Sequence, residues 1–176
     1  MNPNEYMKLV PLSIQYKKAF EEGLDELRGT NGMGFWEEVG APQSIEEYVR
    51  IRLDHSLGKN LPKGWIPATT YWLMDGKIFI GETTIRHQLT EHLRNVGGQI
   101  GYWIRPSKRK QGYGTQILKF SLQEAKKMGL AKIIITCDET NEGSRKIIEA
   151  NGGIFERARD MGAGNPKKLL FWIELN

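Results

Sequence analysis

The sequence is 176 residues long, which predicts one domain, large enough to bury its own core. An aromatic content of 10% argues against disorder, and the one cysteine excludes an intrachain disulfide framework and a cysteine-based zinc cluster. No segment is as long and apolar as a membrane-spanning helix, and residues 1–5 do not resemble the start of a signal peptide. We therefore expect a single cytoplasmic domain over residues 1–176, with no membrane partner.

The net charge of +4 is distributed unevenly. Residues 1–54 carry a net charge of −4, and residues 55–176 carry +8. A protein that binds nucleic acid usually has a long basic stripe, with aromatic side chains that stack on the bases. Here only Tyr113 lies close enough to the basic segment to do so, and we expect no nucleic-acid partner. The densest basic segment is short and holds Arg105, Lys108, Arg109 and Lys110, which favours one compact anion site.

The first predicted element is a short strand over Tyr6–Val10. Ser13 can cap a helix, because the apolar residues that follow it have helical spacing. Glycines between Gly29 and Gly34 then interrupt the chain. Ser44 and Glu47 form a capping box, which predicts a second helix from that point.

The middle of the chain is rich in predicted strands. Asp75-Gly76 predicts a tight hairpin between strands over Thr70–Met74 and Lys77–Arg86, because both central residues of such a turn take positive φ. A third strand is expected over Gly98–Ile104.

The last third of the chain begins with a predicted helix over Tyr113–Met128, which Gly129 ends. Lys132–Cys137 is a continuous apolar run of the kind expected for a strand buried on both faces. The remaining predicted elements are a short helix over Ser144–Ala150 and two closing strands over Ile154–Arg157 and Lys168–Leu175.

The predicted order is β-α-α-β-β-β-α-β-α-β-β. Strands that a hairpin joins pair antiparallel, whereas the strand–helix–strand unit from Gly98 to Cys137 should form a right-handed parallel crossover. The sequence therefore predicts an α/β fold (α+β mixed), with a mixed, mostly antiparallel sheet and helices on its faces.

The segment between the strand ending at Ile104 and the next helix carries the strongest functional signal. Backbone N–H groups at a helix start lack acceptors, and the helix dipole is positive there. Gly112 and Gly114 let the backbone approach a ligand, and Arg109 and Lys110 add positive charge. These features favour a diphosphate ligand, although solvated surface turns of this composition are common. The glycine patterns of nucleoside triphosphatases and of nicotinamide dehydrogenases are absent from this segment.

Arg109-Lys110-Gln111-Gly112-Tyr113-Gly114 resembles the Arg/Gln-x-x-Gly-x-Gly/Ala acetyl-CoA loop of the GNAT superfamily of N-acetyltransferases. Asn141 leads into a short helix that ends at Asn151-Gly152-Gly153, similar to the second signature of that family. The predicted element order also matches the family. The resemblance implies a GNAT-like fold, in which a parallel strand pair at the centre of the sheet splays apart.

The resemblance implies that acetyl-CoA is the co-substrate and that its acetyl group moves by direct transfer to a primary amine of a small-molecule or peptide acceptor. Backbone amides from about Gln111 to Thr115 would hold the pyrophosphate. Pantetheine would lie in the wedge between the strand ending at Ile104 and the strand over Ile133–Cys137, and an N–H near Ile104 would polarise the thioester carbonyl. The residues implied to bind the co-substrate are Ile104, Arg109, Lys110, Gln111, Gly112, Tyr113, Gly114, Thr115, Asn141 and Ser144.

The sequence departs from the family pattern at one position. Many members place a proton-donating Tyr in the helix after the Asn, at a position that falls here on Ile148 or on its neighbour Ile147, and neither can donate a proton. Cys137 or a water could donate the proton instead, or the thiolate could leave unprotonated, since thiol pKa values lie near 8.5. The departure keeps open a non-catalytic acyl-CoA-binding or sensor domain on the same fold.

Three side chains are candidates for the general base. Glu82 shares its strand face with apolar neighbours, which raise a carboxyl pKa, unless it pairs with a Lys or Arg. His87 titrates near neutral pH, unless it is an ordinary solvent-facing residue at a strand end. Asp138, with Glu139 beside it, follows the buried strand, where sites of parallel sheets open, although acids there more often cap helices. A base acting through an ordered water is equally open.

The remaining candidates concern the acceptor. Trp36 and Trp65 lie in predicted loops and could line its pocket, although most such residues pack in the core. The acidic first 54 residues weakly favour a cationic acceptor. His55 and His92 lack metal-ligand spacing, so no metal is assigned. The acceptor is not identified by the sequence, and a homodimer stays open.

Overall fold

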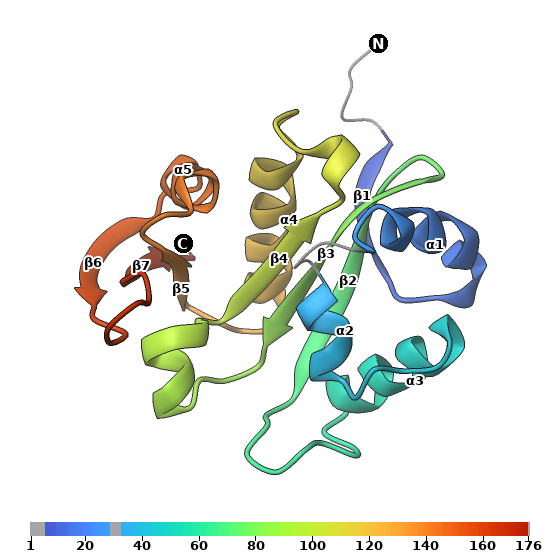
Figure 1. The fold of residues 1–176 in the computed structure, drawn as a ribbon, viewed down its shortest axis with the longest axis horizontal. Helices are drawn as coiled ribbons and strands as arrows, with labels where there is room; N and C mark the ends of the chain where they lie inside the picture. Colours follow the sequence, from blue (N-terminus) through green and yellow to red (C-terminus); the bar gives the residue numbers. More distant parts are fainter. Residues whose placement is uncertain (1–5, 29–32, 176) are drawn as a thin grey trace.

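The computed structural model describes residues 6–28 and 33–175. Residues 1–5 and most of the glycine interruption predicted between Gly29 and Gly34 lie outside these ranges. The described residues form a four-stranded sheet in the order β1-β2-β3-β4 and a three-stranded sheet in the order β5-β7-β6 (Figure 1). The strands are β1 (Met7–Pro11), β2 (Ala68–Asp75), β3 (Ile78–Arg86), β4 (Ile100–Ile104), β5 (Lys132–Asp138), β6 (Ile154–Arg159) and β7 (Lys168–Glu174).

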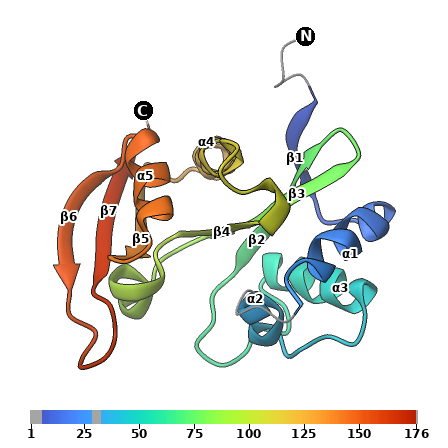
Figure 2. The same cartoon turned by 45° about the horizontal axis from the view of Figure 1, so that its top comes forward.

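The helices divide between the two faces of the four-stranded sheet. Figure 2 shows α1, α2 and α3 on one side of this sheet and α4 on the other, with α5 beside the three-stranded sheet. None of the helices in the described part of the chain is long and apolar enough to cross a membrane. Their bounds are α1 (Lys17–Asp25), which follows a 3₁₀ turn over Ile14–Tyr16, α2 (Gly34–Glu38), α3 (Ile45–Ser56), α4 (Tyr113–Lys127) and α5 (Glu142–Ala150).

An aromatic cluster holds α1 and α3 against the four-stranded sheet. The ring of Phe20 stacks on Trp72 with 4.4 Å between centroids, and on Tyr48 at 5.6 Å. Leu73, the next residue along β2, faces the opposite side and packs with Ile117 of α4. The alternation of side chains along the strand thus builds a separate core on each face.

The predicted start of the second helix is confirmed, with one difference in the cap. The Oγ of Ser44 accepts a hydrogen bond from the backbone N–H of Glu47 at 3.1 Å. The carboxylate of Glu47 accepts from the N–H of Gln43 at 2.8 Å, one residue before the partner of a standard capping box. The sequence signal therefore placed the start of α3 correctly.

The predicted hairpin is present, but its turn is shifted by one residue. Asp75 pairs with Ile78 in the β2–β3 ladder, so Gly76 and Lys77 are the turn residues. Only Gly76 has positive φ, at 59°. The prediction that Asp75 also takes positive φ was wrong, because the ladder extends to that residue.

The predicted parallel ladder between the strands that flank α4 is not formed. All paired strands in the described residues are antiparallel, and β4 and β5 are edge strands of different sheets. The two sheets meet where the N–H of Gln99 donates to the carbonyl of Ile134 at 2.6 Å. Gly98, with φ at 64°, makes this approach possible, since a Cβ there would lie 2.9 Å from the Ile134 oxygen. The separation of the two strands agrees with the splay that the GNAT resemblance implies.

β5 lies at the edge of its sheet, and its pattern of burial differs from the predicted one. The sequence predicts a strand buried on both faces, but burial alternates along it. Ile133, Ile135 and Cys137 are buried, whereas Ile134 and Thr136 are half-buried. Since no strand of the described residues pairs with the outer edge of β5, the apolar run does not indicate a central parallel strand here.

Two short elements escaped the sequence analysis. One is α2, and the other is a π-helical turn over Leu93–Gly97 that precedes β4. Both contain or adjoin glycines, and glycine has a low helix propensity, so the sequence does not predict a helix at either place. Both lie beside the cavity described below.

Candidate functional site

The loop between β4 and α4, residues 105–112, has a backbone shape suited to an anion and is called the anion loop below. Its φ angles are positive at Lys110, at 58°, and at Gly112, at 85°. Successive N–H groups in such a loop converge on one side and form a concave anion site. The N–H groups of residues 110–114 have no acceptor among the residues that the structure describes. The N-terminus of α4 therefore presents free donors and a positive dipole at one place.

Two glycines of this loop have different roles. A Cβ at Gly112 would meet nothing within 4 Å, so the residue is needed for its positive φ and leaves open space beside the donors. A Cβ at Gly114 would lie 2.4 Å from the Cδ1 of Ile147 on α5. Gly114 therefore has a packing role that the sequence analysis did not foresee, because it lets α5 lie close against α4.

The polar side chains of the loop mostly bind back to the protein. The Nε of Arg109 donates to the carbonyl of Ile104 at 3.0 Å, which ties the loop to the end of β4. The side-chain amide of Gln111 donates to the carbonyl of Ser107 at 2.8 Å. The hydroxyl of Tyr113 donates to Asp75 of the β2–β3 hairpin at 2.9 Å. Lys110 and Arg109 are both exposed, and the bond from Arg109 goes to a neutral carbonyl, so both contribute positive charge at the rim.

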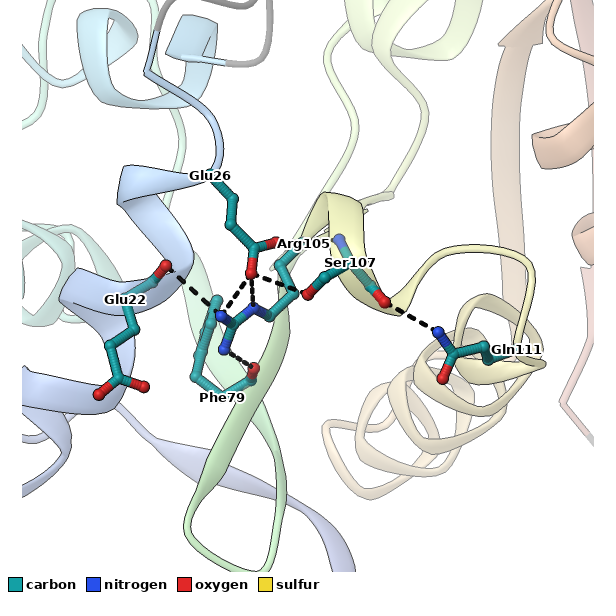
Figure 3. A network of polar contacts seen from close by, with 6 residues as sticks. All are labelled: Glu22, Glu26, Phe79, Arg105, Ser107 and Gln111. Atoms are coloured by element: carbon teal, nitrogen blue, oxygen red, sulfur yellow. Dashed lines mark hydrogen bonds and ion pairs between the residues drawn. The ribbon is translucent and has the colours of Figure 1, made fainter.

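A network of charged hydrogen bonds anchors the start of the loop (Figure 3). The carboxylate of Glu26, just after α1, accepts from Arg105 Nε at 3.0 Å and Nη2 at 2.5 Å. It also accepts from the N–H of Ser107 at 2.9 Å and its hydroxyl at 2.8 Å. Arg105 donates further to the carbonyls of Phe79, at 3.1 Å, and Glu22, at 3.5 Å. The Arg105 guanidinium lowers the pKa of Glu26 to about 2.

The free edge of β4 presents a further donor. The N–H of Arg105 donates to the carbonyl of Ile80 on β3 at 2.9 Å. Because N–H groups along an antiparallel strand alternate in direction, that of Ile104 faces away from β3. No other strand covers this edge among the described residues. The Ile104 N–H is therefore available beside the anion loop.

The asparagines of the second signature hold α5 in place. The side-chain oxygen of Asn141 accepts from the N–H of Ser144 at 3.0 Å and caps α5. The side-chain amide of Asn151 donates to the carbonyls of Ile147, at 2.9 Å, and of Thr115 on α4, at 3.2 Å. Asn141, Ser144 and Thr115 thus lie along the α4–α5 pair, with Asn141 in a capping role.

Tyr102 of β4 is a candidate proton donor that the sequence analysis missed. Its side chain packs against the apolar clusters on the α4 side of the sheet. Its hydroxyl is buried without a hydrogen-bond partner in the described part of the chain. Ser144 is its polar neighbour but lies outside hydrogen-bond geometry, Cys137 is also near, and burial raises the pKa of Tyr102 to about 12. An aromatic residue in a strand gives no sequence signal for this role, since most such residues pack in the core.

A cavity of about 710 Å³ lies on the opposite face of the four-stranded sheet. Every second residue of two neighbouring strands forms its floor: Glu82, Thr84 and Arg86 of β3, and Gly101 and Trp103 of β4. Side chains of α2, α3 and the loop before β2 form its walls, among them Phe35, Arg52 and Trp65. Trp65 therefore lines a cavity, and its role toward an acceptor stays a prediction. Trp36 does not line the cavity and stacks on Tyr48 with 4.8 Å between ring centroids.

Glu82 is a buried carboxylate with strong hydrogen-bond donors around it. It is 2% exposed and accepts from the hydroxyl of Tyr48 at 2.6 Å and from the indole N–H of Trp72 at 2.8 Å. Arg52 donates to the Tyr48 hydroxyl at 3.1 Å. Burial raises the pKa of Glu82, and Arg52, Tyr48 and Trp72 oppose the rise. The alternative that Glu82 forms a simple ion pair at the hairpin edge is wrong, because β3 lies inside the sheet and its partners are neutral donors.

The other two base candidates lie away from the cavity. The Nε2 of His87 is 2.8 Å from the hydroxyl oxygen of Thr69, and burial lowers the pKa of His87. Asp138 pairs with Lys168 of the neighbouring strand, and Glu139 accepts from the N–H of Lys167 at 3.0 Å. Of the three candidates, only Glu82 lines the cavity. The described residues contain no group of three or more side chains that could hold a metal ion.

The Glu26 network makes a prediction about stability and pH. The pKa of Glu26 is about 2 in the folded protein, below its ordinary 4.5, so the unfolded chain takes up the proton first as pH falls. The stabilisation is therefore complete above about pH 4.5 and is lost as pH falls toward 2. Glu26→Gln should lower the free energy of unfolding by about 1–3 kcal/mol at pH 7, and by much less near pH 2, in urea titrations.

Glu46→Gln is the matched control. Glu46 pairs with Lys17 at the exposed surface, so its loss should have a much smaller effect at either pH. An equal loss of stability for Glu26→Gln at pH 7 and near pH 2 would contradict the electrostatic assignment.

Comparison with known proteins places this geometry in a family. The family model of the acetyltransferase (GNAT) domain matches residues 28–154. A putative ribosomal-protein-serine acetyltransferase from Vibrio cholerae has a TM-score of 0.63 at 18% identity, covering 99% of both chains. The ribosomal L7/L12 alpha-N-protein acetyltransferase RimL in complex with coenzyme A has a TM-score of 0.68 at 15% identity, covering 98% of this chain and 96% of that chain.

A third solved structure adds an acetyl-CoA complex. The microcin C7 self-immunity acetyltransferase MccE, in complex with acetyl-CoA and AMP, has a TM-score of 0.67 at 13% identity, covering 99% of this chain and 95% of that chain. No curated protein sequence matches the chain. The family model spans most of the sequence and the structural likenesses extend over nearly all of it, so the chain belongs to the GNAT acetyltransferase family.

Proposed function

We propose that the protein is an N-acetyltransferase that moves the acetyl group of acetyl-CoA directly to a primary amine of a small-molecule or peptide acceptor. The observation that carries the proposal is that the anion loop and the cavity with the buried Glu82 adjoin the same edge strand, β4. RimL and MccE, which share the fold, have been solved with coenzyme A and acetyl-CoA respectively, which supports the choice of co-substrate.

The free N–H groups of residues 110–114 would bind the diphosphate, and Lys110 would add charge at its rim. The open edge of β4 would hydrogen-bond the pantetheine amides as it would an added strand. The N–H of Ile104 would then donate to the thioester carbonyl oxygen and stabilise the negative charge that develops there. All these groups are backbone donors, so the site depends on backbone shape more than on particular side chains.

Glu82 would accept the proton that the amine loses, directly or through a water, as the amine nitrogen bonds to the carbonyl carbon. The carbon–sulfur bond then breaks. The hydroxyl of Tyr102 would donate a proton to the departing sulfur, which Ile148 cannot do. Bulk solvent afterwards returns a proton to Tyr102 and removes one from Glu82.

The alternative is an acyl-CoA-binding or sensor domain, which needs the loop but no base. The buried carboxylate in a cavity of substrate size favours the enzyme, because burying Glu82 costs stability that binding alone does not require.

Incubation with acetyl-CoA and a library of primary amines, with detection of free thiol, tests the proposed function. Millimolar acetyl-CoA should raise the melting temperature, and some amines should release coenzyme A. If acetyl-CoA gives no thermal shift, the enzyme and the sensor are both excluded. A shift without turnover on any amine would identify the sensor.

Replacement of Gly112 by Val tests the loop. Val must take a strained positive φ, and its side chain must enter the open space beside the free donors. We expect acetyl-CoA affinity, measured by calorimetry, to fall by about tenfold or more. Gly129→Val is the matched control, since Gly129 has φ at 82° and equally open surroundings at the other end of α4. Equal acetyl-CoA affinity in the two variants would refute the loop assignment.

Glu82→Gln and Tyr102→Phe test the two proton transfers. Because burial raises the pKa of Glu82, wild-type kcat/KM should fall as pH drops through a value above the ordinary carboxyl range, and Glu82→Gln should remove this limb. Each substitution should slow transfer by about 10²–10⁴-fold while acetyl-CoA binding persists. The exposed Glu37→Gln should behave as wild type. A pH–rate profile that Glu82→Gln leaves unaltered would remove Glu82 as the base.

A further inference from the structure

The cavity contains a guanidinium with no carboxylate partner. Arg86 lies on the cavity face of β3, with Glu82 and Thr84. Its Nη1 donates to the backbone carbonyls of Gly97 and Gly98, each at 3.2 Å, and these are neutral acceptors. No carboxylate of the described residues lies within ion-pair distance of Arg86, and its Nε and Nη2 have no partner there. An arginine in this setting is an incomplete anion site.

The floor beside this guanidinium is open because of a glycine. Gly101 of β4 is the register partner of Thr84, and a Cβ at Gly101 would lie 4.0 Å from Nη1 of Arg86. The guanidinium therefore lies over the backbone of β4 at Gly101, two residues before Trp103 on the same face of the strand. A side chain at this point would fill the space between Arg86 and the rest of the cavity.

The other charged groups of the cavity do not neutralise Arg86. Arg52 donates to Tyr48 and to the carbonyl of Phe35, close to the buried Glu82. Glu38 attracts Arg86 but is exposed and forms no ion pair with it. The remaining titratable residues of the lining are Lys63, His92, Tyr102 and His55, and burial lowers the pKa of His55. The lining thus has three basic groups, Arg52, Arg86 and Lys63, against two carboxylates, Glu38 and Glu82, and carries a small excess of positive charge although residues 1–54 as a whole are acidic.

We propose, on the basis of the proposed function, that the acetyl acceptor is an amine that also carries an oxyanion, a carboxylate or a phosphate, and that Arg86 binds this oxyanion over Gly101. The distance along β4 supports the arrangement. Ile104 is three positions after Gly101, about 10 Å along the strand, so the amine and the oxyanion are separated by a short chain. The volume of about 710 Å³ is that of a small-molecule site.

A structural role alone is the rival explanation. Arg86 could serve only to hold the carbonyls of Gly97 and Gly98 at the end of the π-helical turn. That role predicts no effect of the acceptor's charge on its binding, so the test compares acceptors that differ in charge alone.

Kinetics with ω-amino carboxylates of increasing chain length, with O-phosphoethanolamine and with the matching ω-amino carboxamides provide the first measurement. We expect the anionic amines to have kcat/KM values about tenfold or more above those of the carboxamides. Arg86→Gln should lower the values for the anions to those of the carboxamides. Arg50→Gln removes an exposed arginine of α3 that does not line the cavity, and the preference should persist in this variant. Equal rates for charged and neutral amines in the wild type would overturn the proposal.

A binding measurement separates this proposal from the proposed function. Glutarate and inorganic phosphate, which cannot be acetylated, should raise the melting temperature of the wild type, with and without coenzyme A, whereas glutaramide should not. The shift should be absent in Arg86→Gln and partly kept in Arg86→Lys. If neither anion stabilises the wild type, the anion site is refuted, whether or not acetyl transfer occurs. If Arg86→Gln does not fold, the comparison of glutarate with glutaramide on the wild type still decides.

Discussion

The pairing of Glu26 with Arg105 is the constraint on which the co-substrate side of the structure depends. Arg105 follows β4 directly, at the point where the chain must leave the sheet and turn toward α4. Its side chain lies almost entirely out of solvent, 11% exposed, where an unpaired guanidinium would cost several kcal/mol. Glu26 compensates that charge and also accepts both donors of Ser107. Glu26, a carboxylate of the acidic N-terminal segment, thereby fixes Arg105 and Ser107 at the start of the anion loop.

The rest of the loop takes its shape from this anchor. Ser107, held by Glu26, accepts from the Gln111 side chain, and Arg109 ties back to the end of β4. The free donors of residues 110–114 are therefore in place before a ligand binds, and association does not have to order them. The sequence carries a net charge of −4 over residues 1–54 and +8 beyond them. Part of this asymmetry is explained by the ion pair between Glu26, in the acidic segment, and Arg105, in the basic one.

The parts of the site that the sequence predicted are those with local signals. The anion loop and the ends of α3 and α4 follow from Gly112, Ser44 and Gly129, because caps and turns depend on a few neighbouring residues. No local signal predicted how the two sheets meet, since their contact depends on the approach of Gly98 to a strand distant in sequence, and only the family resemblance implied that β4 and β5 separate. Gly101 is likewise an ordinary strand residue until the fold brings Arg86 over it. A glycine in a sequence does not reveal whether it supplies a positive φ, a close contact or an open floor.

The alternation of β4 suggests how the fold manages without a tyrosine in α5. Side chains along a strand alternate between its two faces, while every second N–H points along the sheet to its edge. Trp103, in register with Glu82, therefore faces the cavity, and Tyr102 faces α4 and α5. The Ile104 N–H lies at the edge between them. A thioester bound at this edge would meet the amine and its base on one face and a proton donor for sulfur on the other. In the proposed mechanism the strand itself would keep the two proton transfers apart, and the donor need not come from the helix.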